Sequence, residues 1–276
     1  MLDTNHDDER LTARVLIARQ LRKLREEAGL SLRKLGSEIH FQHSYISDVE
    51  SGRKLPSEEM ARALDERFSP TIPFTDLLEV VRDALIADYS RTVVAREAEA
   101  IRIEVFGSSV IPGLLQTEAF ARELLRAGLP RESSAEIDAR VAAHMKRKRI
   151  LEGKTPPLYW AVLDEVVLMR SVAQKGAARE QLSALLTASE HPHITLQIYP
   201  LANGLHSMQG GSLTMLTLRD GQRVGLVESF GSGEPVESPL RLVEYAQLFD
   251  MAKLNALSKQ DSRKLVSRYL EETRDD

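Results

Sequence analysis

The sequence predicts an α+β protein in which an N-terminal all-α bundle is followed by a mostly helical domain containing a small mixed four-stranded sheet. Three observations support this fold class. Apolar side chains recur at helical spacing from residue 11 to residue 68. Short runs rich in β-branched residues, the signal of strands, occur only after Pro156 and Pro157. Two of these runs flank Asp220-Gly221, a pair typical of hairpin turns.

The composition is that of an ordinary globular protein. A chain of 276 residues, 42% of them hydrophobic, is long enough for two domains with separate cores. It contains no apolar run long enough to span a membrane, and residues 1–14 lack the pattern of a signal peptide, so we expect a cytoplasmic protein without membrane contact. The absence of cysteine excludes disulfides, thiolate zinc sites, iron–sulfur clusters and cysteine nucleophiles.

The net charge of −4 is unevenly distributed along the chain. Residues 10–55 contain ten Lys or Arg and five Asp or Glu, a net charge of +5, whereas residues 56–276 contain 27 and 32, a net charge of −5. Residues 1–9 add four acids. Cations near DNA phosphates release condensed counterions, which favours binding. The basic N-terminal part is therefore the predicted DNA-facing surface.

A compact bundle of four or five helices is predicted in this N-terminal part. Residues 1–10, which precede them, are mostly polar and acidic and are expected to form a disordered tail. Within the helices apolar residues share one face, as Leu32, Leu35 and Ile39 do in the second helix. The predicted helices cover residues 11–28, 32–39, 43–51 and 57–68.

The two central helices, separated only by residues 40–42, have the order of a helix-turn-helix, whose second helix lies in the DNA major groove. Ser31 can cap the first of them with its hydroxyl oxygen. Gly52 follows the second at a position where a left-handed backbone ends helices, and Pro56 closes the next loop. These signals predict a DNA-reading helix over residues 43–51.

Residues 22–56 resemble the XRE family of phage-repressor-like helix-turn-helix domains, through the segments LRKLREEAGLS and YISDVESGRKLPS. The resemblance implies a domain over residues 11–70 that binds double-stranded DNA as a sequence-specific transcriptional regulator. Carried over by position, it implies base reading by Gln42, His43, Ser44 and Ser47. It also implies phosphate contacts by Arg33, Arg53 and Lys54, which fix the register without reading sequence.

Three positions of this segment lead to separate expectations. Glu50 resembles the family's acid at the end of the reading helix and is expected to bond locally. Asp48 would place an acid near the duplex and weaken nonspecific affinity. Gly36 stands where many members have alanine; it permits close helix approach but costs about 1 kcal/mol in helix propensity.

The second domain is predicted to span residues 71–276, and residues 69–73, SPTIP, are the candidate linker, although a helix could leave the bundle at Thr75. Two helices between the first two predicted strands favour a parallel pairing of those strands. The predicted strands cover residues 158–163, 194–199, 212–218 and 224–230. The predicted helices cover residues 75–105 (one or two helices), 114–127, 133–152, 164–172, 177–189, 238–254 and 258–271.

The second domain resembles the C-terminal domain of the WhiJ-like group of actinobacterial regulators. The resemblance rests mainly on VIPGLLQTEAFARELL at residues 110–125, LDEVVLMR at 163–170 and HPHITLQIYPLANG from 191. It implies a transcriptional regulator encoded beside a small partner protein, in an antitoxin-like arrangement, and neither an enzyme nor a cofactor. An antitoxin-like protein that neutralises its partner and uses DNA only for autoregulation is the alternative.

Four residues of this domain are weak candidates for contact with a partner or a small-molecule ligand: Gln116, Arg147, Glu165 and His206. A ligand pocket is expected between the loop at residues 203–211 and the sheet. Asp164 and Glu165 could also be combined with His191, His193 and His206 into the site of a metal-dependent hydrolase. The first turn of a helix explains the two acids more simply, so no catalytic or metal site is predicted.

A homodimer is expected on energetic grounds. One helix-turn-helix buries too little surface for useful specificity, whereas two copies that read half-sites about one DNA turn apart multiply it.

Overall fold

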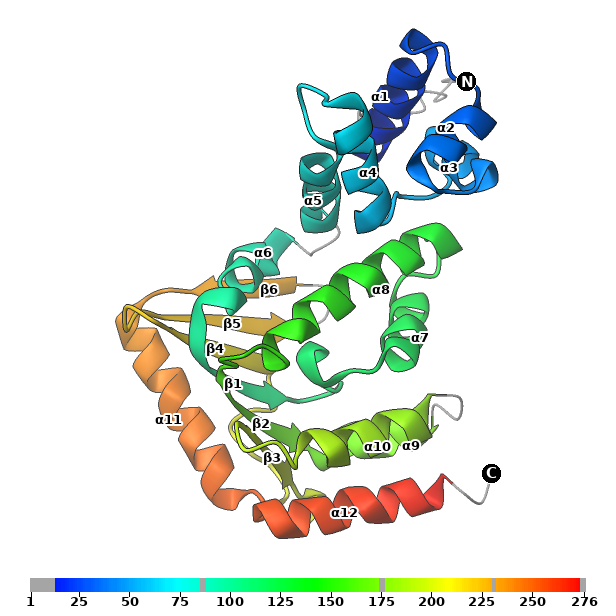
Figure 1. Ribbon diagram of the computed structural model, residues 1–276. Coiled ribbons are helices and arrows are strands. Elements are labelled where there is room, and N and C mark those ends of the chain that lie inside the picture. Colours follow the sequence, from blue (N-terminus) through cyan, green and yellow to red (C-terminus); the bar gives the residue numbers. More distant parts are fainter. Residues whose placement is uncertain (1–12, 85–87, 174–176, 230–231, 274–276) are drawn as a thin grey trace, which may run out of the picture. The chain divides into compact units, whose positions relative to one another are not determined.

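The computed structural model describes residues 13–84, 88–173, 177–229 and 232–273; the predicted tail at residues 1–10 lies outside these ranges. The chain forms two compact units, one built from the N-terminal helices and one built around a sheet (Figure 1). In the described part of the chain, no helix has the length and apolar character needed to cross a bilayer.

The first unit is an all-α bundle, as predicted. Its apolar core includes the buried residues Ile17, Leu21, Leu35, Ile46 and Leu64. The helices that correspond to the four predicted ones match them closely. The N-terminal helices of the unit are α1 (Ala13–Glu27), α2 (Leu32–Ile39), α3 (His43–Glu50), α4 (Glu58–Phe68) and α5 (Phe74–Ala84), and the unit also includes Ser133–Arg140.

The turn between α2 and α3 requires a glycine in α2. The side chain of Ser31 caps α2 by accepting a hydrogen bond from the amide of Lys34 at 3.2 Å. His40 then adopts a left-handed conformation with φ 61°, and the Phe41 amide donates to the Gly36 carbonyl at 3.0 Å. A Cβ at position 36 would lie only 2.5 Å from the Phe41 carbonyl oxygen. The close approach expected at Gly36 is therefore confirmed.

Residues 69–73 turn the chain from α4 into α5. The Asp65 carboxylate accepts hydrogen bonds from the amides of Phe74 (2.5 Å) and Thr75 (3.1 Å), and so caps the start of α5. Phe74, Leu77 and Leu78 are buried in the core of the first unit. Helix α5 is consequently an integral part of the bundle.

The second unit contains a six-stranded mixed sheet in the order β3-β2-β1-β4-β5-β6. The predicted parallel pairing of the strands around helices α9 (Glu165–Ala173) and α10 (Ala178–Ala188) is confirmed, because β2 and β3 are parallel. β1 also runs parallel to β2, and the other pairs are antiparallel. The strands are β1 (Ala100–Gly107), β2 (Leu158–Asp164), β3 (Ile194–Tyr199), β4 (Ser212–Leu218), β5 (Arg223–Ser229) and β6 (Ser232–Val236).

The prediction of four strands was wrong, because β1 and β6 were not recognised. The region predicted as helix over residues 75–105 instead contains α5, α6 (Asp88–Ala95) and most of β1. In β1, Ile101, Ile103 and Val105 alternate with charged residues, which is the spacing of a strand. β6 contains Pro235, which is unfavourable in a central strand but tolerated here because β6 is an edge strand.

Helices cover both faces of the sheet (Figure 1). One face packs Tyr159, Ala161 and Leu163 of β2 against helices α7, α9, α10 and α12 in the main core. The other packs Phe106 and Val162 against α11. The helices not yet defined are α7 (Glu118–Gly128), α8 (Ser134–Lys148), α11 (Pro239–Asn255) and α12 (Lys259–Glu272).

Helix α7 begins later than predicted. Residues Gly113–Leu115 form a single 3₁₀ turn, and the helix starts at Glu118 after the side chain of Thr117 accepts a hydrogen bond from the Phe120 amide. Leu114 and Leu115 are nevertheless buried.

Candidate nucleic-acid interface and a buried pocket

Helix α3 presents one anchored and one free face. Ile46 and Val49 are buried in the core of the first unit. On the outer face, the predicted base-reading residues Gln42, His43 and Ser44 are exposed, and Ser47 is half-buried. No hydrogen bond joins these four side chains to other residues of the described part of the chain. Polar side chains exposed at the start of a helix can bond to base edges in a major groove.

The predicted phosphate contacts Arg33, Arg53 and Lys54 are all exposed but differ in their surroundings. Arg33 has no side-chain partner among the described residues. Arg53 and Lys54 both bind the Asp48 carboxylate, with nitrogen–oxygen distances of 2.8 and 3.1 Å. The hydrogen bonds from Arg53 and Lys54 lower the pKa of Asp48 below its usual value. Two of the three cations are thus held by an acid on the same surface.

Two anchors fix the ends of α3. The Tyr45 hydroxyl donates to the Leu55 carbonyl at 3.1 Å and accepts from the Ser57 amide at 2.7 Å, which holds the loop after α3. The Arg25 guanidinium of α1 donates to both oxygens of Glu50, at 2.6 and 2.9 Å. The expected local bonding of Glu50 is confirmed.

The four candidate partner or ligand residues fall into two groups. Glu165 and His206 lie near Asp164 at the carboxyl end of β2. Nε2 of His206 is 2.9 Å from the Asp164 carboxylate, and Glu165 accepts hydrogen bonds from the Tyr269 hydroxyl and the Leu201 amide. These polar groups satisfy one another inside the fold.

The residues of the metal-dependent alternative do not form one group. His191 and His193 precede β3, whose first residue pairs with Tyr159, whereas Asp164 pairs with the last residue of β3. The two ends are five residues, or about 16 Å, apart along a strand. Within the described ranges, no cluster of three or more His, Asp or Glu side chains is arranged to hold a metal ion.

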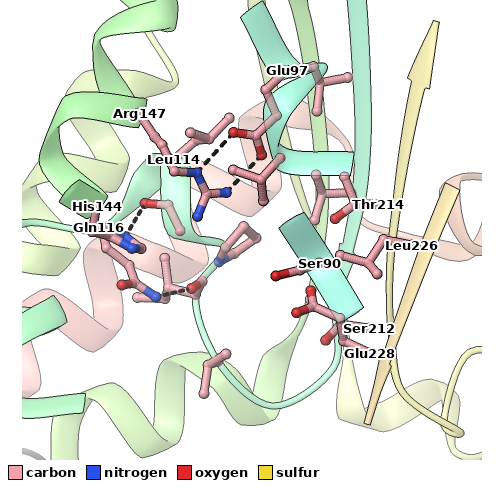
Figure 2. A pocket seen from close by; sticks show the side chains of 18 of the residues that line it. Ser90, Glu97, Leu114, Gln116, His144, Arg147, Ser212, Thr214, Leu226 and Glu228 are labelled. Carbon is pink, nitrogen blue, oxygen red and sulfur yellow. Dashed lines mark hydrogen bonds and ion pairs between the residues drawn. The ribbon is translucent and has the colours of Figure 1, made fainter. Parts of the chain in front are cut away.

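Gln116 and Arg147 line a pocket of about 240 Å³ on the face of the sheet covered by α7 and α8 (Figure 2). Neither Glu165 nor His206 lines it. The walls are mostly apolar and come from α6, β1, the loop at residues 110–114 and α7. Gln116 is buried and donates to the Ile111 carbonyl at 2.6 Å.

The single arginine that lines the pocket is already paired. Arg147 donates to both oxygens of Glu97, at 3.0 and 2.8 Å (Figure 2). Nε2 of His144 lies 2.9 Å from the Gly113 carbonyl oxygen. Burial lowers the pKa of His144 to about 4, so this side chain is neutral at pH 7.

Two other polar groups of the pocket have no hydrogen-bond or ion-pair partner among the described residues. Tyr159 is buried, and its hydroxyl has no hydrogen-bond partner in the described part of the chain. No hydrogen bond or ion pair joins the Glu228 carboxylate to another described residue. Burial raises the pKa of Glu228, an effect that Arg147 opposes and Glu97 reinforces.

Sequence reasoning did not identify Glu97, Tyr159 or Glu228. They lie far apart in the chain and meet only because of the sheet order and the return of α8. The sequence contained one signal of the pocket, namely polar residues on the inward face of strands: Ser212, Thr214 and Glu228. That face could be assigned only once the pairing register was known.

Comparisons with known proteins agree with both resemblances. The family model described as "Domain of unknown function (DUF5753)" matches residues 90–268, and a "Helix-turn-helix domain" model matches residues 16–68. The "HTH-type transcriptional regulator DdrOP3" of Deinococcus deserti is 30% identical over 132 residues, which are 48% of this chain and 96% of that protein. No solved structure matches the chain.

Proposed function

Because the chain belongs to the DUF5753 family and carries a helix-turn-helix domain, we propose that this DNA-binding regulator reads a specific operator through α3 and receives a signal through its second unit. The observation that carries the proposal is the exposed start of α3, where Gln42, His43 and Ser44 have no side-chain partner in the described chain. The regulator name of the relative and the net charge of +5 over residues 10–55 support it.

The two functions are assigned to successive parts of the chain. Residues 11–70 bind DNA, α5 completes the bundle that they form, and the second unit receives the signal. Ser47 adds a fourth base-reading position one turn along α3, and Arg33, Arg53 and Lys54 hold the phosphates. The site of action is the cytoplasm, where the DNA of such a regulator lies. No catalytic role is part of the proposal.

The regulator acts as a homodimer, and an exposed apolar stripe on α11 supports this. Leu240, Val243, Met251 and Leu254 are 48% to 84% exposed. They lie at equal distances in sequence on either side of Gln247, so an antiparallel second copy would present the same pattern. A twofold interface requires such a self-complementary surface.

The signal is a small protein encoded nearby, as the WhiJ-like resemblance implies. Expression of the chain together with the product of the adjacent gene, followed by co-purification, tests this part. A partner that binds and is neutralised without changing DNA affinity would favour the antitoxin-like alternative.

DNA recognition is tested by titrating the protein onto its own upstream region and onto shuffled DNA of equal length, at two salt concentrations. His43→Ala should reduce the preference for the operator over shuffled DNA, because it removes a base contact. Lys54→Ala should weaken binding to both DNAs equally and lower the salt dependence. Equal behaviour of the two variants would contradict the assignment of their roles.

A further inference from the structure

The pocket beside Arg147 is large for a structural void. Its volume of about 240 Å³ lies just below the range of roughly 300–1,000 Å³ that holds drug-sized ligands. A single buried water needs far less space. The pocket therefore suits a small organic molecule, with apolar walls along most of its length.

The charges of the pocket select the sign of the ligand. Arg147 is bound by Glu97, and His144 is neutral at pH 7. Neither side chain therefore offers a free positive charge to an anion. Glu228 lines the pocket as a half-buried carboxylate without a partner among the described residues (Figure 2). A buried carboxylate gains most from a cation that also donates a hydrogen bond. An ammonium group meets both requirements.

We propose that this pocket binds a small amine, whose ammonium pairs with Glu228 and whose apolar body lies along the pocket walls. The site itself does not depend on DNA binding. Its use as the input of the regulator rests on the proposed function.

Calorimetric titration of the full chain, without DNA, tests the site. The probes are a series of straight-chain amino alcohols, from aminobutanol to aminooctanol, with the matching diols and hydroxy acids. We expect saturable binding of an amino alcohol, weaker binding of the diol and no binding of the hydroxy acid. Glu228→Gln should weaken amine binding by about tenfold to a hundredfold.

One variant outside the pocket serves as the control. Glu234→Gln removes a carboxylate from the neighbouring strand and should bind the amine as the wild type does. Melting curves establish that each variant is folded. Absence of amine binding, equal binding of the diol, or an affinity unchanged by Glu228→Gln would overturn the proposal. Since no DNA is present, a failure of operator recognition would leave this result intact.

Discussion

At the residue scale, Asp48 controls how much charge α3 and its loop can offer to DNA. It holds Arg53 and Lys54, whose side chains are otherwise largely in solvent. Asp48→Asn should raise the affinity for shuffled DNA about threefold to tenfold at low salt, because both cations become free for phosphates. The gain should shrink as salt rises, since exposed charges are screened. Fluorescence anisotropy at several salt concentrations measures it.

The control for this effect is Glu38→Gln. Glu38 is an acid of α2 bound to Arg67, so its removal changes the net charge of the same unit by the same amount. An equal gain in this control would show that net charge alone, and not the release of Arg53 and Lys54, raises DNA affinity.

Gly36 illustrates two opposed effects of one methyl group. Alanine favours helix by about 1 kcal/mol over glycine. In α2, however, its Cβ would approach the Phe41 carbonyl oxygen to 2.5 Å, and backbone atoms cannot easily move away. Overpacking costs about 1–3 kcal/mol, so Gly36→Ala should lower the stability of the first unit by about 1–2 kcal/mol. Thermal unfolding followed by circular dichroism measures this change.

Ser37→Ala is the matched control, because Ser37 is exposed on the same helix. Ser37→Ala should leave the midpoint temperature of thermal unfolding unchanged or raise it slightly. A Gly36→Ala variant as stable as this control would mean that the turn between α2 and α3 relaxes without cost.

His144 makes the stability of the second unit depend on pH. Its folded pKa is about 4, whereas an unfolded histidine titrates near 6.5. Between these two pKa values the unfolded chain binds a proton at this histidine and the folded chain does not. The free energy of unfolding therefore falls as pH falls from about 6.5 towards 4. Between pH 7 and about pH 4, the free energy of unfolding of the wild type should fall by about 2–3 kcal/mol more than that of His144→Gln.

Urea unfolding followed by tryptophan fluorescence provides this measurement, because the single tryptophan, Trp160, lies in β2 of the same unit. His40→Gln, at an exposed position of the first unit, controls for the loss of a histidine as such. A parallel pH dependence of His144→Gln and the wild type would show that His144 is protonated without penalty in the fold.

At the scale of elements, local sequence signals were reliable where each element carried its own boundaries. The helices around α3 have a capping serine, left-handed residues at their ends and an unbroken apolar face, and their ranges were predicted closely. The prediction of β1 failed for the opposite reason. Its apolar residues continue the pattern of the preceding helix without a glycine or proline between them, so nothing local marks the change of spacing near Glu97.

The two candidate sites differ in the same way. The DNA-facing residues lie within 22 positions of one another, from Arg33 to Lys54, so their grouping follows from the helical period alone. The pocket takes Glu97, Tyr159 and Glu228 from three distant segments. Their meeting depends on a strand order in which β1 lies between β2 and β4, and no single segment encodes that order.

At the scale of the whole molecule, the remaining question is how one short reading helix achieves specificity. An isolated helix-turn-helix contacts few base pairs, whereas a twofold dimer reads two half-sites with a fixed spacing. The apolar stripe of α11 is the surface that we assign to the dimer. A charge placed in its middle would be buried without a partner in the assembled dimer, which is strongly unfavourable.

Val243→Glu and Met251→Glu should therefore each shift the protein towards monomer, with a dimer dissociation constant at least about tenfold higher in sedimentation velocity. Ile72→Glu, at an exposed apolar position of the first unit, should leave the dimer intact. The α11 variants should also lose affinity for an operator with two half-sites while binding a single half-site as the wild type does. Because the charged residues lie outside the DNA-reading unit, a loss on both DNAs would instead indicate that α11 supports α3 directly and that dimerisation is not the source of specificity.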